Sequence, residues 1–153
     1  MKRLLRSRFS ALLLASASVL LLTTVAAHAQ ITHGVHASVP FAFNAGDTKL
    51  PPGNYTIRVL DIEDPHVLTI ADKSGKVEVL FTTEAARVDQ APGKTELVFD
   101  KVGDREFLSQ IWLEGMRDGY QLAKSRMQLK LEKAGAKPQS QRVPGTHQKK
   151  ATS

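Results

Sequence analysis

The stretch Val35-His36-Ala37-Ser38-Val39-Pro40-Phe41-Ala42-Phe43 decides the fold of this chain. Larger apolar residues or alanine occupy every second position from Val35, and His36, Ser38 and Pro40 lie between them. This period of two predicts a β-strand with one buried face, because successive side chains of a strand point to opposite sides. Pro40 has no N–H to donate to a sheet, so the pattern predicts an edge strand or a bulged one.

Five more strands are expected further along the chain, at a spacing of about ten residues. Short apolar runs separated by turn residues lie at 55–59, 66–71, 77–82, 97–99 and 106–113. The sequence Asp72-Lys73-Ser74-Gly75-Lys76 predicts a hairpin turn between two of these runs, since Gly75 can take a positive φ. We therefore expect an all-β fold, a small sandwich or barrel of about six antiparallel strands.

The segment after Gly119 is predicted to form a C-terminal helix that covers the sheet, with Gly135 as its stop. Helical spacing relates Leu122, Ala123, Met127, Lys130, Leu131 and Ala134. Alternation within 127–131 leaves a seventh strand as the alternative, although the residue types favour a helix. From residue 136 the chain lacks large apolar residues other than valine, so 136–153 is predicted to be a disordered basic tail.

Residues 1–29 have the three-part build of a secretory signal peptide. Four basic residues precede an apolar run at 9–25, and the small residues Ala27 and Ala29 mark a cut before Gln30. The alternative is an uncleaved anchor, which needs about 20 apolar residues. We expect an exported protein, periplasmic or secreted, with a β-domain at 30–135 and no stable membrane insertion once the signal is removed.

The charge distribution argues against nucleic-acid binding. The chain has 21 basic and 15 acidic residues, but residues 1–29 hold four basic residues and no acid, and 132–153 hold five basic residues against one acid. Residues 30–131 keep 12 basic and 14 acidic residues, a net charge of −2. A nearly neutral body does not provide the basic surface that nucleic acid requires. The chain has no Cys, so packing alone must stabilise it after export.

Two pairs of residues are candidate sites. Trp112 and Tyr120 would suit a sugar or a peptide as an exposed aromatic pair beside a sheet, or they belong to the core. His33 and His36 form an H-x-x-H pair that could hold Cu or Ni near a new N-terminus. The alternative is two exposed histidines, one in the segment before the first strand and one on the polar face of that strand. No cofactor is predicted.

Catalytic motifs are absent from the sequence. It has no Cys nucleophile, no G-x-S-x-G elbow and no S-x-x-K motif. We therefore expect a protein that is not an enzyme.

Four blocks of sequence resemble a group of small exported bacterial β-domain proteins of unknown function. The blocks are Val39-Pro40-Phe41-Ala42-Phe43, Leu50-Pro51-Pro52-Gly53-Asn54-Tyr55-Thr56-Ile57, Gln110-Ile111-Trp112 and Gly119-Tyr120-Gln121-Leu122-Ala123-Lys124-Ser125. The resemblance spans most of 35–134 and implies export and a compact domain. It brings no reaction, cofactor or functional residue.

These observations favour a non-enzymatic exported domain that binds a cell-envelope protein or polysaccharide. Two alternatives stay open: a small extracytoplasmic hydrolase acting on polymers, and an exported metal-binding protein that uses His33 and His36. The sequence does not indicate an oligomeric state.

Overall fold

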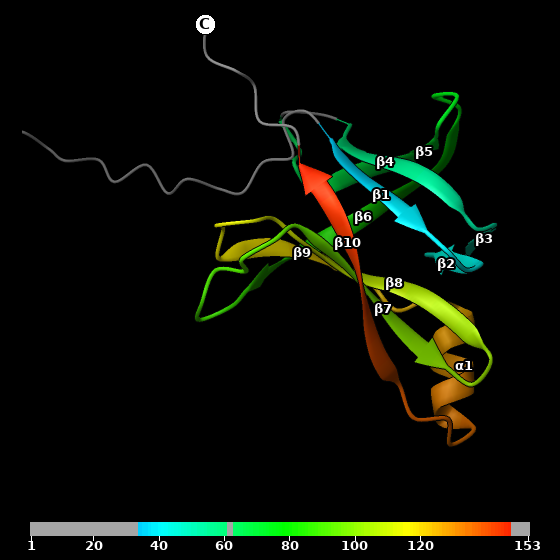
Figure 1. The fold of residues 1–153 in the computed structure, drawn as a ribbon. Coiled ribbons are helices and arrows are strands. Elements are labelled where there is room, and N and C mark those ends of the chain that lie inside the picture. The colour runs from blue at the N-terminus through cyan, green and yellow to red at the C-terminus, as the bar shows by residue number, and fades with distance from the viewer. Residues whose placement is uncertain (1–33, 61–62, 148–153) are drawn as a thin grey trace, which may run out of the picture.

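The computed structural model describes residues 34–60 and 63–147, which form ten strands and one short helix (Figure 1). The predicted all-β class with a C-terminal helix is therefore confirmed. The predicted signal peptide, with its cleavage residues Ala27, Ala29 and Gln30, lies outside the described residues. In the described ranges, no helix is both long enough and apolar enough to cross a membrane.

The strands are β1 (Val35–Val39), β2 (Phe43–Ala45), β3 (Thr48–Leu50), β4 (Gly53–Val59), β5 (Val67–Asp72), β6 (Val77–Arg87), β7 (Glu96–Val102), β8 (Arg105–Trp112), β9 (Asp118–Leu122) and β10 (Gln139–His147), and the helix is α1 (Arg126–Lys133).

Eight of these strands close into an antiparallel barrel. Their order is β8-β7-β10-β1-β4-β5-β6-β9, and β9 pairs again with β8. The β2–β3 hairpin extends the barrel, because β2 runs parallel to the first residues of β8. Closure gives each of the eight strands a partner on both sides, which is how all-β folds remove exposed edges.

Two long strands change their pairing partner along their length. β6 pairs with β5 through Thr82 and with β9 from Thr83, and β10 pairs with β7 through Pro144 and with β1 from Gly145. A Cβ added at Gly145 would lie 3.2 Å from the carbonyl oxygen of His36. Glycine therefore fits the point where β10 changes partners, since there is little room for a side chain.

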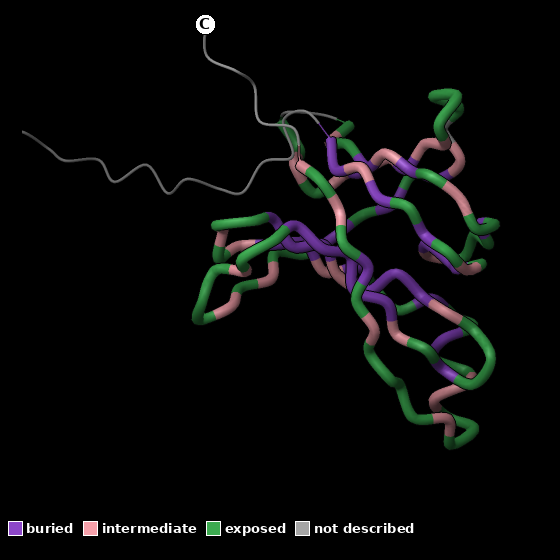
Figure 2. The backbone as a smooth tube through the Cα atoms, viewed as in Figure 1, coloured by how far each residue is buried: buried purple, intermediate pink, exposed green. Residues whose placement is uncertain are grey.

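Alternate residues of the strands fill the barrel interior, drawn purple in Figure 2. The predicted inward residues of β1 are buried: Val35, Ala37 and Val39. The ring of Phe43 meets Tyr55 and Phe99 edge to face, with ring centroids 5.3 and 5.2 Å apart. This is the favoured geometry for aromatic pairs.

The prediction that β1 is an edge or bulged strand is wrong. β1 pairs with β10 on one side and with β4 on the other. Pro40 lies one residue beyond the end of β1, so its lack of an N–H donor removes no hydrogen bond from the pairing of β1. The chain resumes as β2 at Phe43, so the predicted single strand is two strands separated by a break at 40–42.

The predicted helix is confirmed only in its second half. α1 begins after Ser125, whose hydroxyl oxygen accepts a hydrogen bond from the N–H of Gln128 at 3.1 Å, and Gly135 follows its end with φ +98°. The first half of the predicted helix contains β9, because Tyr120 and Leu122 belong to the barrel core. Barrel closure outweighs the helical spacing there.

The prediction of a disordered tail from residue 136 is wrong for the part of it that the structure describes. Gln139–His147 forms β10, which lies between β7 and β1. Val143 is the strand's buried apolar side chain, so the composition carries little sign of burial. The strand is held chiefly by its two backbone ladders, and residues 148–153 lie outside the described range.

Candidate functional site

A groove of about 850 Å³ lies on the outer face of β10, β1, β4 and β5, the strands in the upper part of Figure 1. Because Val35, Ala37 and Val39 point into the barrel, His36 and Ser38 must point outward. The volume lies within the range of known ligand clefts, roughly 300–1,000 Å³.

The register of the four strands arranges the outward residues in rows. In the central row, His36 of β1 lies opposite Thr146 of β10 on one side and Thr56 of β4 on the other. Thr56 in turn lies opposite Ala71 of β5. Four strands that are distant in sequence therefore contribute one residue each to a continuous row across the groove.

The rows on either side carry further polar groups. Ser38 lies opposite Asn54 in one row, and Arg58 lies opposite Thr69 in the other. Lys73 follows the last residue of β5 and lines the same groove. Arg58 and Asn54 are four residues apart along β4, so the rows span about 14 Å along the strand direction.

Polar side chains from all four strands line the groove, together with the small apolar residues Ala37, Ala71 and Pro144. None of the exposed large apolar side chains found among the described residues lies in it. Nδ1 of His36 lies 2.9 Å from Oγ1 of Thr56, which holds the imidazole on the groove floor. His36, Thr56 and Thr69 are half-buried, whereas Asn54 and Arg58 are exposed. The floor therefore offers hydroxyl and imidazole groups, and the rim offers an amide and a guanidinium.

The groove carries an excess of positive charge. Arg58 and Lys73 line it, and Asp72 is the acid among its described lining residues. Oδ1 of Asp72 accepts hydrogen bonds from the hydroxyl and N–H of Ser74, at 2.5 and 2.7 Å, and from the N–H of Lys76 at 3.1 Å. These bonds, led by that of the Ser74 hydroxyl, lower the pKa of Asp72. Its carboxylate is thus engaged in the β5–β6 turn.

Gly34 lies against two of the side chains that line the groove. Its φ is +100°, and an added Cβ would lie 3.1 Å from Cγ2 of Thr56 and 3.2 Å from Cγ of Arg58. A larger residue would be strained and would press against both side chains. The residue before β1 is therefore suited to leaving space beside Thr56 and Arg58.

Trp112 and Tyr120 do not form an exposed pair, and the alternative that they belong to the core is confirmed. They are 5% and 3% exposed, and Tyr120 belongs to the barrel core. Nε1 of Trp112 donates a hydrogen bond to Oε1 of Gln110 at 3.0 Å, and the ring lies against Gly119. Neither residue lines the groove. Their burial removes the exposed aromatic surface on which the ligand-binding prediction depended.

The predicted histidine pair is only half described. His33 lies outside the described residues, and His36 contacts Thr56 on the groove floor. Within the described ranges, no three His, Cys, Asp or Glu side chains gather as a metal-ligating group. Metal binding by His33 and His36 therefore stays a prediction.

The sequence did contain a signal for some groove residues. Thr56 and Arg58 alternate with apolar residues in β4, and this marks them as outward-facing polar residues. Thr146 gave no such signal, because it lies in the segment that was predicted to be disordered. Alternation also says nothing about strand order, which is what brings these residues together.

Comparison of the chain with known protein families, with curated proteins and with solved structures finds no match.

Proposed function

We propose that this protein is an exported, non-enzymatic domain that binds an acidic cell-envelope polysaccharide in the groove of β10, β1, β4 and β5. The observation that carries the proposal is the polar row formed by Thr146, His36 and Thr56, with Arg58 and Lys73 toward the two ends of the groove. Export rests on the composition of residues 1–29.

The lining chemistry favours a polysaccharide over a protein as the ligand. Protein interfaces depend on a few aromatic or apolar anchor residues that become fully buried. The groove instead presents hydroxyls, an imidazole and an amide, which can exchange hydrogen bonds with sugar hydroxyls. Arg58 and Lys73 add attraction for carboxylate or phosphate groups on the polymer.

We propose binding without turnover because the carboxylate of Asp72 does not orient the imidazole of His36. A hydrolytic base is commonly held by a carboxylate, as in catalytic triads. Here Nδ1 of His36 faces the Thr56 hydroxyl, and the Asp72 carboxylate is engaged by Ser74 and Lys76.

The test is isothermal titration of the purified protein with acidic and neutral envelope polysaccharides, while the length of each polymer is followed. We expect heat on titration with the acidic polymers and no change in their length. The variant Thr56→Val/Thr69→Val removes two hydroxyls at nearly constant volume and should weaken binding about tenfold, at roughly 0.5–1.5 kcal/mol per hydrogen bond.

Thr48→Val/Thr82→Val is the matched control, because both of its threonines are exposed strand residues outside the groove. It should bind as the wild type does. Equal weakening by both double variants would contradict the groove assignment, and shortening of the polymer would replace binding with hydrolysis. Heat from an envelope protein but from no polysaccharide would overturn the choice of ligand.

A further inference from the structure

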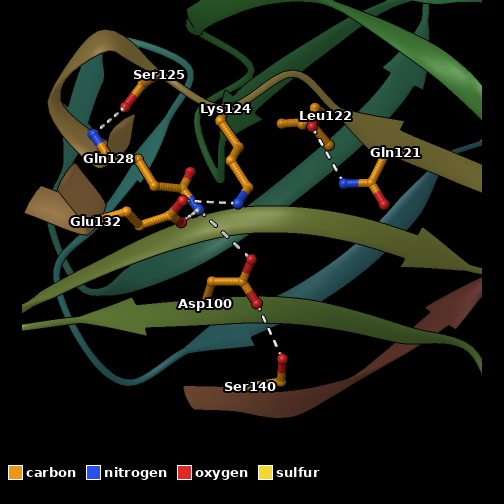
Figure 3. A network of polar contacts seen from close by, with 8 residues as sticks. All are labelled: Asp100, Gln121, Leu122, Lys124, Ser125, Gln128, Glu132 and Ser140. Carbon is orange, nitrogen blue, oxygen red and sulfur yellow. Dashed lines mark hydrogen bonds and ion pairs between the residues drawn. The ribbon is translucent and has the colours of Figure 1, made fainter. Parts of the chain in front are cut away.

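Helix α1 packs on the barrel through polar side chains (Figure 3). Gln128 is only 3% exposed, and its Nε2 lies 3.5 Å from Oδ2 of Asp100 in β7 and 3.3 Å from Oε1 of Glu132. Asp100 also accepts a hydrogen bond from the hydroxyl of Ser140 in β10 at 2.9 Å. The contact between helix and barrel is thus a hydrogen-bonded network.

Glu132, the acidic residue of α1, belongs to this network. Oε2 of Glu132 lies 2.8 Å from Nζ of Lys124, so its charge is neutralised next to the barrel. Glu132 is the only acidic residue in Arg126–Lys133. The remaining charges of the helix are therefore all positive.

The outward face of α1 is a row of cations flanked by apolar side chains. Arg126, Lys130 and Lys133 follow one another at steps of four and three residues, so they line one side of the helix, and all three are exposed. Met127 and Leu129 lie on the two flanks of this row and are 40% and 43% exposed. We call these five residues the α1 face.

This arrangement is the reverse of an ordinary surface helix, which turns its apolar residues to the core and its polar residues to water. Here the buried position is Gln128, and two large apolar residues stay outside. A soluble polyanion would engage the cations but would leave Met127 and Leu129 in water. A lipid surface offers anionic headgroups to the cations and the acyl boundary to the apolar side chains.

We propose that the α1 face binds an anionic lipid surface without insertion of the chain across it. The helix lies at the opposite end of the molecule from β4 and β5 (Figure 1), so a protein attached through α1 keeps its outer groove away from the lipid. The proposal does not depend on a polysaccharide ligand, because the α1 face and the outer groove share no residue.

The test uses the exported protein, whose N-terminus is determined first. It is sedimented together with vesicles of equimolar phosphatidylglycerol and phosphatidylcholine. Vesicles of phosphatidylcholine alone and soluble dextran sulfate are the comparisons. We expect binding to the anionic vesicles that weakens as salt is raised, and little binding to the neutral ones. Lys130→Gln/Lys133→Gln should weaken it about 25-fold, at roughly fivefold for each cation near the surface.

Two further variants make the result specific. Met127→Gln/Leu129→Gln should weaken vesicle binding several-fold while leaving any dextran sulfate binding unchanged. Lys76→Gln/Lys94→Gln removes two exposed cations elsewhere and should bind as the wild type does. Circular dichroism of every variant checks that α1 still forms.

Three results would overturn the proposal. They are equal binding to neutral and anionic vesicles, equal losses in the α1 variant and in the control, or dextran sulfate binding as tight as vesicle binding. The last would make the α1 face a general polyanion site. Sugar binding in the outer groove would be unaffected by any of them.

Discussion

The contact between Gly119 and Trp112 gives a sharp test of how tightly the outside of the barrel is packed. In Gly119→Ala, the new Cβ would lie 2.4 Å from Cε3 of Trp112 and 2.7 Å from the carbonyl oxygen of Ile111. Real Cβ atoms essentially never come so close to other heavy atoms, so the indole ring or the strand must shift. Trp112 is only 5% exposed, which leaves it little free space to move into.

Overpacking of this kind costs about 1–3 kcal/mol. For a domain of this size, that corresponds to a fall in Tm of roughly 4–15 °C. Trp112 is the only Trp in the chain, so its fluorescence reports directly on the displaced ring. We expect Gly119→Ala to melt earlier and to emit at longer wavelength, because the indole becomes more exposed to water.

Gly93→Ala is the matched control. An added Cβ at Gly93 meets nothing within 4 Å, and this glycine does not have a positive φ. The substitution should leave emission unchanged and should be neutral or stabilising by up to about 1 kcal/mol, since alanine restricts the unfolded chain. If Gly119→Ala melted and emitted as Gly93→Ala does, the packing argument would be refuted.

Three further predictions concern stability. Arg142→Met should lower the free energy of unfolding in urea by about 1–3 kcal/mol, because the buried carboxylate of Glu96, which is 4% exposed, loses its partner Arg142. Glu96→Gln/Arg142→Met should recover part of that loss, and an equal loss in both variants would count against the pair. Burial raises the pKa of Glu106 above its ordinary value of 4.5, and its Oε2 is buried without a hydrogen bond among the described residues. Protonation of Glu106 therefore favours the folded state. Stability is lost as the pH rises through the folded pKa. The stability of Glu106→Gln relative to the wild type should therefore grow as the pH rises through the folded pKa of Glu106, and a difference that stays constant with pH would contradict this. Ser125→Ala removes the cap that accepts the N–H of Gln128 and should cost about 1 kcal/mol with some loss of helix signal in circular dichroism.

The sequence was informative wherever one face of a strand carries apolar residues. Alternation in 35–39 and 55–59 predicted β1 and β4, and both form with the predicted inward residues. The hairpin turn at 72–76 was predicted because Gly75 can take a positive φ, and its φ is +84°. In these segments local preference and tertiary packing agree.

The sequence failed where a strand is held mainly by its neighbours. β10 was missed because, apart from Val143, it has almost no buried apolar residues, and its pairing with β1 and β7 cannot be seen locally. The sequence places β9 in a helix, since Leu122 fits the helical spacing of the residues that follow it. Both errors hid the closure of the barrel.

The candidate site was out of reach for the same reason. The sequence indicates His36 only as a candidate metal ligand, because the residues beside it come from strands whose order the sequence does not reveal. Thr146 and Thr56 lie on its two sides only when β10 and β4 are placed next to β1. For Trp112 and Tyr120 the core alternative is confirmed, but the sequence gives no sign that Gly119, just before Tyr120, lies against the ring of Trp112.

The assignment of the outer groove as a polysaccharide site is tested by a backbone amide chemical-shift map of the isotope-labelled protein on addition of an acidic envelope polysaccharide. We expect the largest shifts on His36, Thr56 and Thr69, whose strands form the outer groove with β10. Shifts confined to β8 and β9, or the same shifts in Thr56→Val/Thr69→Val at equal polymer concentration, would contradict it.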